Sequence, residues 1–224
     1  MSGHILSPNQ KVVNFAKSRD GNVVGEGNCT NLAEEALAYA GAQDEYAIMG
    51  DDKVKEDSDY EWGDLVKDVK DIRPGDIIQF RNYVVKTDDV TVYKFPDDRG
   101  HFSDKSPWFS IGTFDAADRP RPHHTAISFS MLQHGTITMW EQWPGQVVNQ
   151  VTIYVKRSKK VERGEIPCGE IMIPDDELIG QFSLQRNIKK AAMERSRTCK
   201  ARTVRTITHT PSGQYWIYRP QKKK

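Results

Sequence analysis

A single cysteine stands where a glycine-rich segment meets a predicted helix. Residues 21–28, GNVVGEGN, are rich in glycine, and residues 30–39 contain strong helix formers that end before Gly41. Cys29 is therefore expected at a helix N-terminus, where unpaired backbone N–H groups and the helix dipole favour a thiolate. A thiolate in that position would be a nucleophile that a substrate could reach past the glycine loop.

A nucleophilic thiol needs an imidazole within hydrogen-bond reach and a third polar group that orients the imidazole. His124 begins HTAISFSML, a segment whose alternation predicts a strand, and TITMWEQW predicts its hairpin partner. In that hairpin Glu141 lies close to opposite His124, so its carboxylate would hold the imidazole. His123 is the alternative base, and Gln142 is the alternative third residue.

The residue before the cysteine is the candidate for holding an oxyanion. The side-chain amide of Asn28 could donate to the developing charge, as could the backbone N–H of Cys29. The competing interpretation is that Asn28 serves the turn geometry of the glycine loop. No spacing of His, Cys and Asp suits a metal ion, and no cofactor is expected.

The other two cysteines receive a structural interpretation. Cys168 and Cys199 are distant from Cys29, and none of the three belongs to a CxxC pair. An odd count without such spacing argues against a disulfide framework and against a zinc site. Both are expected to be small buried residues.

The amino-acid composition limits the classes of protein to which the chain can belong. The chain has 224 residues, of which 37% are hydrophobic and 28% are charged, which is typical of a soluble globular protein. No apolar run approaches the roughly 20 residues that span a bilayer. The start, MSGHILSPNQ, lacks the features of a signal peptide, so the sequence as given predicts a cytoplasmic location, with export by a non-classical route left open.

The net charge of +1 conceals an asymmetry. Residues 186–224 hold twelve Lys and Arg against one acid, Glu194, whereas residues 1–185 hold 20 basic and 30 acidic residues. Two interpretations follow. The two parts complement each other across the fold, or the basic C-terminal region binds an anionic partner.

The order of the predicted elements indicates the fold class. Ser7-Pro8 predicts the start of an amphipathic helix, and RPGDIIQF at 73–80 predicts a strand. Helices first and hairpin-connected strands afterwards indicate an α+β domain, with N-terminal helices packed on a largely antiparallel sheet. A single domain over 1–220 is expected, followed by a basic tail at 221–224.

Two long insertions interrupt this pattern, at about 84–122 and 156–202. The second is expected to lie outside the central sheet and to contain a helical segment around 184–195. After it, TVRTIT at 203–208 and QYWIYR at 214–219 are expected to pair as two strands, because THTPSG between them has turn chemistry.

Five segments together resemble the CHAP family, the cysteine- and histidine-dependent amidohydrolases and peptidases. GNCTNLAEEAL resembles its nucleophile segment, RPGDIIQF its Pro-Gly-Asp strand, and HTAISF the strand of its catalytic histidine. WEQW resembles the following Glu-Gln-Asn strand, and YWIYRP the closing strand. The resemblance implies a papain-like fold with Cys29 as nucleophile, His124 as base and Glu141 as orienting residue. Trp143 stands where the family often has Asn, so the third role falls on Glu141 or Gln142.

The chain also resembles papain-like domains of some bacteria and of fungal cortical actin-patch proteins. Those domains share a Glu/Asn-Cys loop, His-His-Thr-Ala-Ile and a terminal Tyr-Arg-Pro, and they need not be cell-wall enzymes. Together the resemblances imply a hydrolase of amide or peptide bonds, with peptides such as peptidoglycan stems as substrates. The alternative is a non-catalytic papain-like interaction module whose basic C-terminal region binds an anionic partner.

Overall fold

The computed structural model divides the chain into two compact units. The first comprises 1–86, 117–158 and 210–224, and the second comprises 87–116 and 159–209. The residues that the structure describes are 6–55, 57–96, 101–104, 108–168, 171 and 199–223. The candidate site lies in the first unit.

Local signals explain where the helices begin and end. Helix α1 (Pro8–Ser18) starts with a capping box, in which the Ser7 hydroxyl accepts from the Gln10 N–H and the Gln10 side chain accepts from the Ser7 N–H. Helix α2 (Cys29–Ala40) ends at Gly41, whose φ of 67° is the left-handed conformation that glycine adopts readily. Helix α3 (Glu45–Met49) follows shortly afterwards.

The strands form one eight-stranded sheet. Its path is β1-β8-β2-β4-β5-β6, with β3 paired to β2 and β7 paired to β8. The pairs β1–β8, β2–β4, β4–β5 and β5–β6 are antiparallel. The strands are β1 (Asp64–Leu65), β2 (Ile77–Lys94), β3 (Phe109–Ala117), β4 (Arg121–Ser128), β5 (Thr136–Glu141), β6 (Asn149–Tyr154), β7 (Ser158–Pro167) and β8 (Lys200–Arg219); a short 3-10 helix, η1, spans Val69–Asp71.

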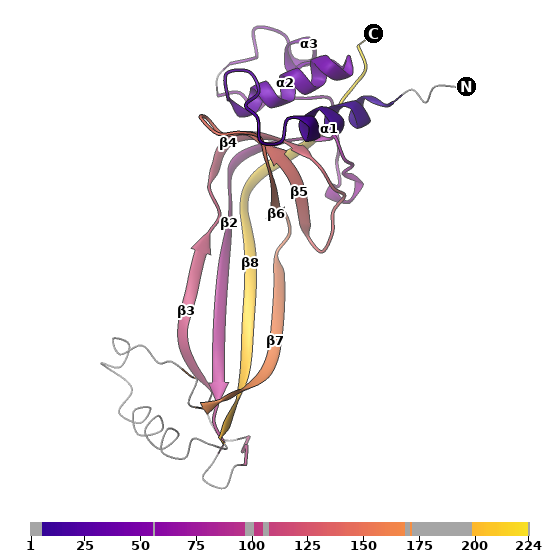
Figure 1. The fold of residues 1–224 in the computed structure, drawn as a ribbon. Helices are drawn as coiled ribbons and strands as arrows, with labels where there is room; N and C mark the ends of the chain where they lie inside the picture. The colour runs from indigo at the N-terminus through magenta and orange to yellow at the C-terminus, as the bar shows by residue number, and fades with distance from the viewer. Residues whose placement is uncertain are drawn as a thin grey trace, which may run out of the picture. The chain divides into compact units, whose positions relative to one another are not determined.

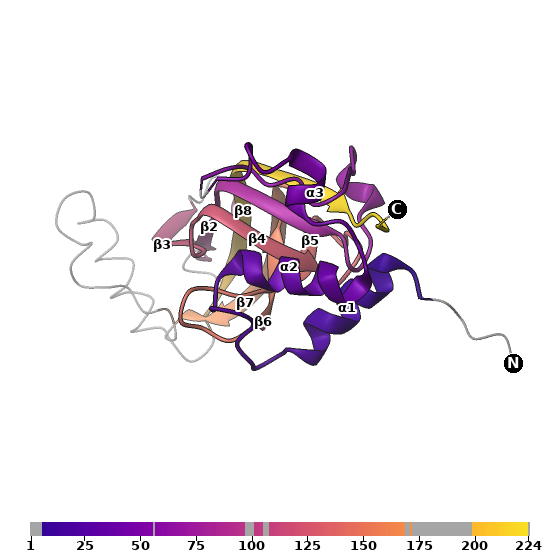
Figure 2. The same cartoon turned by 90° about the horizontal axis from the view of Figure 1, so that it is seen from above.

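Helices packed on an antiparallel sheet were expected, but the balance is more strongly β than the α+β prediction implied. The described residues contain three α-helices beside the eight strands. Helices α1 and α2 contact β4, and they lie across the sheet face formed by β4 and β5 (Figures 1 and 2). Helix α2 thus presents its first residue, Cys29, close to the strands that carry the other candidate residues.

Alternation along β4 assigns its side chains to two cores. Ile127 lies in the core beneath the helices, together with its partner Ile77 on β2. Ala126 lies in the core on the opposite face, with Phe80. Because successive strand residues point to opposite faces, Thr125 faces the helices, whereas the side chain of His124 is on the other face.

Two predictions about residues 156–219 were wrong. Residues 158–167 were expected outside the sheet, but they form β7 and pair with β8. Strand β8 is continuous over Lys200–Arg219, so the turn expected between 208 and 214 is absent. Gly213 serves a close approach instead of a turn, because a Cβ there would lie 2.2 Å from the carbonyl oxygen of Asn82. The helix expected around 184–195 lies outside the described residues.

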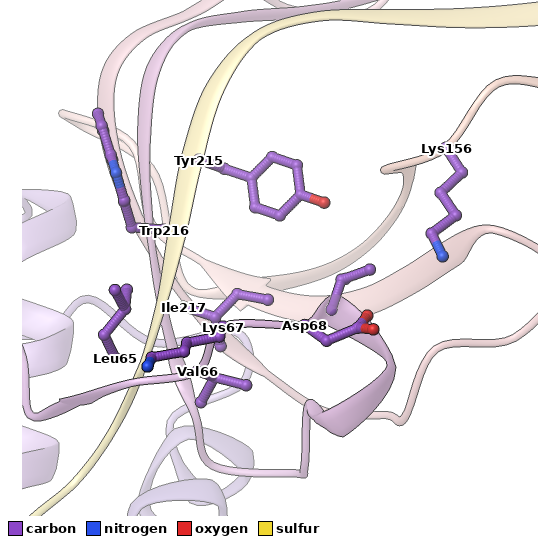
Figure 3. A pocket seen from close by; sticks show the side chains of 9 residues that line it. Leu65, Val66, Lys67, Asp68, Lys156, Tyr215, Trp216 and Ile217 are labelled. Atoms are coloured by element: carbon purple, nitrogen blue, oxygen red, sulfur yellow. The ribbon is translucent and has the colours of Figure 1, made fainter.

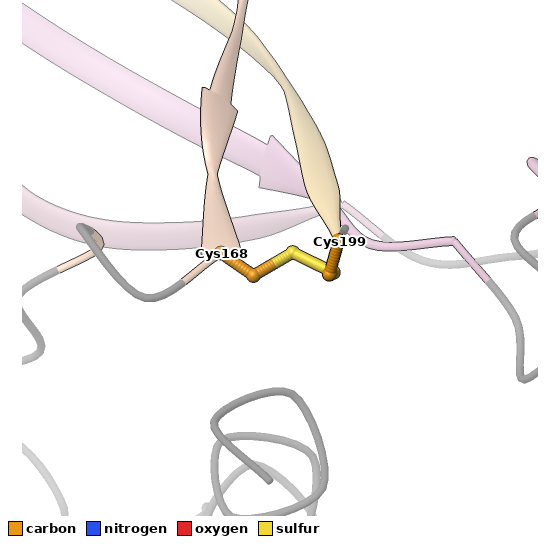
Figure 4. Close-up of a disulfide and its surroundings, with 2 residues drawn as sticks. All are labelled: Cys168 and Cys199. Atoms are coloured by element: carbon orange, nitrogen blue, oxygen red, sulfur yellow. A yellow bond between two sulfur atoms is a disulfide. The ribbon is translucent and has the colours of Figure 1, made fainter. Parts of the chain in front are cut away.

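The prediction for the two cysteines of the second unit was also wrong. Cys168 and Cys199 were expected to be separate buried thiols, but they form a disulfide (Figure 4). Their Cα atoms are 5.4 Å apart across a sequence separation of 31. Pairing at that separation depends on β7 meeting the start of β8, which the cysteine spacing alone does not indicate.

The expected C-terminal tail is attached to the first unit. The Gln43 N–H donates to the Gln221 carbonyl at 2.8 Å, and the Lys223 N–H donates to the Gly41 carbonyl at 3.1 Å. The Lys223 ammonium also lies 3.4 Å from the Asp44 carboxylate. In the described part of the chain, no helix has the length and apolar character needed to cross a bilayer.

Candidate active site

Cys29 is the first residue of α2, as the sequence predicted, and Asn28 is its N-cap. The side chain of Asn31 folds the preceding loop onto this first turn. Its Oδ1 accepts from the backbone N–H groups of Glu26 at 3.0 Å and Asn28 at 3.3 Å. Gly25 is required beside it, because φ is 56° and a Cβ there would lie 2.8 Å from the Asn31 Cβ. The exposed Asn28 therefore occupies a fixed backbone position next to the sulfur.

Gln142 holds the same loop from the other side. Its Oε1 accepts from the Val24 N–H at 2.7 Å, and its Nε2 donates to the carbonyls of Val24 at 2.9 Å and Asn28 at 3.0 Å. The side chain is fully buried. The sequence offered Gln142 as an alternative third residue of a triad. In the structure both polar atoms of its amide are hydrogen-bonded to the loop backbone. Gln142 therefore positions Cys29 through the backbone of Asn28.

Glu141 is the group that contacts the histidine. Its Oε2 lies 3.1 Å from His124 Nε2, and the two side chains are 4% and 1% exposed. Trp143 stacks on the imidazole with ring centroids 4.0 Å apart and donates its Nε1–H to Glu141 Oε1 at 2.9 Å. The guanidinium of Arg121 binds the same carboxylate at 3.1 and 3.3 Å. The pairing of His124 with Glu141 that the hairpin predicted is therefore present.

The charge states of this pair follow from its surroundings. Burial alone would raise the pKa of Glu141, but the hydrogen bond from His124 and the charge of Arg121 hold that pKa at about 2. Burial lowers the pKa of His124, although the Glu141 carboxylate opposes the shift. An ionised carboxylate can only accept, so the neutral imidazole carries its hydrogen on Nε2. Nδ1 is then the nitrogen with a free lone pair.

The environment of the thiol differs from the sequence expectation. Burial raises the pKa of Cys29, and this outweighs the hydrogen bonds with the backbone of Thr125 and with the first N–H groups of α2, which lower it. The raised pKa favours a neutral thiol in the resting protein over the thiolate that the helix N-terminus predicted. Thr125 directly follows His124 along β4. Among the contacts of the described residues, those of the sulfur go to Thr125 and α2, and none joins it to the His124 ring.

His123, the alternative base, faces the helix side with Thr125. Its Nε2 lies 2.5 Å from the carbonyl oxygen of Ser58, and its ring centroid is 5.3 Å from that of Tyr60. Burial raises the pKa of Tyr60, and charge on Cys29 would raise it further. His123, Tyr60 and Cys29 thus share one side of the sheet, whereas the His124 side chain lies on the other face.

A search among known proteins gives the family. Residues 9–171 match the model of the AIM3/BBC1 cysteine proteinase-fold domain. The chain belongs to this family. No curated protein and no solved structure matches it.

Membership in the AIM3/BBC1 family establishes a papain-like cysteine proteinase fold. It corrects the CHAP resemblance, because the matching family is not that of the bacterial cell-wall hydrolases. Asp76 of the Pro-Gly-Asp strand and Arg219 of the closing Tyr-Arg-Pro form an ion pair at 3.0 Å, and Asp76 is fully buried.

Three residues of this AIM3/BBC1 domain form a group beside the sulfur that the sequence did not predict. Thr125 contacts Cys29, and its hydroxyl also donates to Gln79 Oε1 at 2.8 Å. Trp62 donates its Nε1–H to the same oxygen at 3.1 Å. Only the strand register reveals this group, since Gln79 on β2 lies directly opposite Thr125 on β4.

A separate cavity of about 440 Å³ lies in the first unit of the AIM3/BBC1 domain (Figure 3). Its lining consists of residues 65–69, Lys156 and residues 215–217. None of the candidate catalytic residues belongs to it. Within the described residues, no cluster of three or more His, Cys, Asp or Glu side chains could hold a metal ion.

Proposed function

We propose that this chain is a cysteine-dependent hydrolase of amide or peptide bonds, with Cys29 as nucleophile and His123, the alternative base, in place of His124 as general base. The supporting observation is that the His123 side chain faces the helix side of the sheet, where Cys29 opens α2, whereas His124 and its partner Glu141 lie on the other face. His123 shares the helix side with Thr125, the residue that contacts the sulfur. Its Nε2 lies 2.5 Å from the carbonyl oxygen of Ser58, which can only accept, so Nε2 carries the hydrogen and Nδ1 is left to accept a proton.

A neutral thiol determines the order of events. As the Cys29 sulfur attacks the carbonyl carbon, its proton passes to His123 Nδ1, so ionisation accompanies attack. The oxyanion accepts from the Cys29 N–H, and the exposed amide of Asn28 is the second candidate donor. The imidazolium then protonates the leaving amine. Water, deprotonated by His123, hydrolyses the thioester to release the acid and restore the thiol.

A non-catalytic interaction module is the second candidate. It is favoured by the raised pKa of Cys29, because a half-buried neutral thiol is a poor resting nucleophile. Binding of an anionic partner through the C-terminal region has less support. Arg205 pairs with Asp89, Arg219 with Asp76 and Lys223 with Asp44, so these cations complement acidic residues of the same chain.

Cleavage of a fluorogenic peptide library, with peptidoglycan stem peptides as a separate arm, tests the proposal. We expect hydrolysis by the wild type, none by Cys29→Ala, and a loss of about 10²–10⁴-fold in His123→Gln. The matched variant His124→Gln should retain activity when it folds. Loss of activity only in folded His124→Gln would transfer the role of base to His124. Wild-type release no greater than that of Cys29→Ala in both arms would leave the interaction module as the function.

A further inference from the structure

A buried row of polar side chains leads from Trp62 to the thiol. Trp62 and Gln79 are fully buried, and Thr125 is 1% exposed. Gln79 Oε1 accepts two hydrogen bonds, from Trp62 Nε1 at 3.1 Å and from Thr125 Oγ1 at 2.8 Å. Thr125 in turn contacts the Cys29 sulfur through its hydroxyl and its backbone.

The orientation of the Gln79 amide is fixed by its two donors. The indole N–H of Trp62 can only donate, so it requires the amide oxygen rather than the amide nitrogen. The consequence is an unsatisfied group, because Gln79 Nε2 is buried without a hydrogen-bond partner among the described residues. An unmade hydrogen bond of this kind costs free energy and calls for an explanation.

The hydroxyl of Thr125 has one proton to donate. With that proton on Gln79 Oε1, Thr125 Oγ1 offers the sulfur only a lone pair. A lone pair can accept from the S–H of a neutral thiol, but it cannot donate to a thiolate. Ionised Cys29 would therefore need Thr125 to rotate and give up its bond to Gln79.

We propose that Gln79 is a positioning residue that withholds the Thr125 hydroxyl proton from Cys29 and so keeps the resting nucleophile a neutral thiol. The inference deepens the proposed hydrolase, because thiol ionisation belongs to its first step, but it concerns the thiol itself. The titratable groups around the sulfur are Tyr60, which lies near Glu34 and Glu45, and His123 on β4, whereas His124 lies on the other face of that strand.

The pH dependence of Cys29 alkylation by iodoacetamide tests this inference. Under non-reducing conditions the reaction reports on Cys29, because Cys168 and Cys199 form the disulfide. Gln79→Met nearly preserves volume and removes the acceptor, which frees Thr125 to donate to the thiolate. We expect the apparent pKa of Cys29 to fall by about one unit, so that alkylation at pH 7 becomes about tenfold faster.

Three variants separate this role from a general loosening of the core. Trp62→Phe leaves the Thr125–Gln79 bond in place, and its titration should match the wild type. The double variant Gln79→Met/Thr125→Val should lose the fall in pKa, whereas Gln79→Met/Thr125→Ser should keep it. Gln79→Leu provides a second removal of the acceptor if Gln79→Met does not fold.

Equal titrations in the wild type and in the folded acceptor-free variant would overturn the inference, as would an equal fall in Trp62→Phe. The outcome is independent of catalysis. A shifted titration without peptide cleavage retains the role of Gln79 and rejects the hydrolase. Peptide cleavage with an unshifted titration rejects the role of Gln79 and retains the hydrolase.

Discussion

His124 Nε2 and Glu141 Oε2 are joined at 3.1 Å in a region where neither side chain is more than 4% exposed. The same carboxylate balances the buried guanidinium of Arg121. Glu141 therefore fixes the tautomer of His124 and neutralises the cation beside it. Its removal should destabilise the fold.

Glu141→Gln should lower the free energy of unfolding by about 3–5 kcal/mol at pH 7, because Arg121 would be left as an unpaired buried charge. The pKa of Glu141 is held at about 2, so its stabilising effect is present above about pH 4.3 and is lost as the pH falls toward 2. Urea unfolding from pH 2 to 7 measures both effects. The exposed Glu61→Gln is the control, and an equal loss in both variants would contradict the prediction.

The effect of Glu45 on the free energy of unfolding should have the opposite dependence on pH. This side chain is 2% exposed, and burial together with Glu34 raises its pKa to about 7. A carboxyl with a raised folded pKa stabilises the protein less as the pH rises from about 4.3 through 7. Glu45→Gln should therefore increase the free energy of unfolding by about 3 kcal/mol at pH 8 and change it little at pH 4. The exposed Glu35→Gln on α2 should show no such pH dependence in the same unfolding experiment.

Asp76 and Arg219 form an ion pair that connects two of the sequence motifs. Fully buried Asp76 also accepts from Asn9 Nδ2 at 2.6 Å and from the Arg73 N–H at 2.8 Å. Arg219→Leu should cost about 3–5 kcal/mol, because the buried carboxylate loses its cation. Arg205→Leu breaks the more exposed pair with Asp89 and should cost much less, because solvent screens an exposed pair. Denaturant midpoints that rank the two variants in reverse would refute this assignment.

The thiol count offers a direct check on the cysteines. Cys168 and Cys199 are paired, whereas Cys29 is free. Protein purified without reductant and then denatured should show one thiol with Ellman's reagent, and three after reduction. The Cys29→Ala variant should show none and two under the same conditions. Three thiols in unreduced wild-type protein would exclude the disulfide.

Some elements of the site were predictable because they depend on neighbours in the sequence. The capping residues before Pro8 and the glycine after Ala40 set the ends of α1 and α2. Alternation in two adjacent segments predicted the β4–β5 hairpin, and this placed Glu141 beside His124. The prediction of two paired strands at 203–208 and 214–219 was wrong because a contact distant in the sequence decides this segment. Turn chemistry at Gly213 is local, but its use there is set by the approach of Asn82 on another strand.

The sequence by itself determined that a cysteine opens a helix and that a histidine and a glutamate meet on a hairpin, because short-range patterning controls both. Only the tertiary structure decided the charge state of that cysteine. Its thiol pKa reflects burial against β4, which overrides the helix N-terminus. The contacts of Gln142 with Val24 and of Gln79 with Thr125 join residues 118 and 46 positions apart. Hydrogen bonds between such distant residues depend on strand register, which is settled only when the whole sheet packs against the helices.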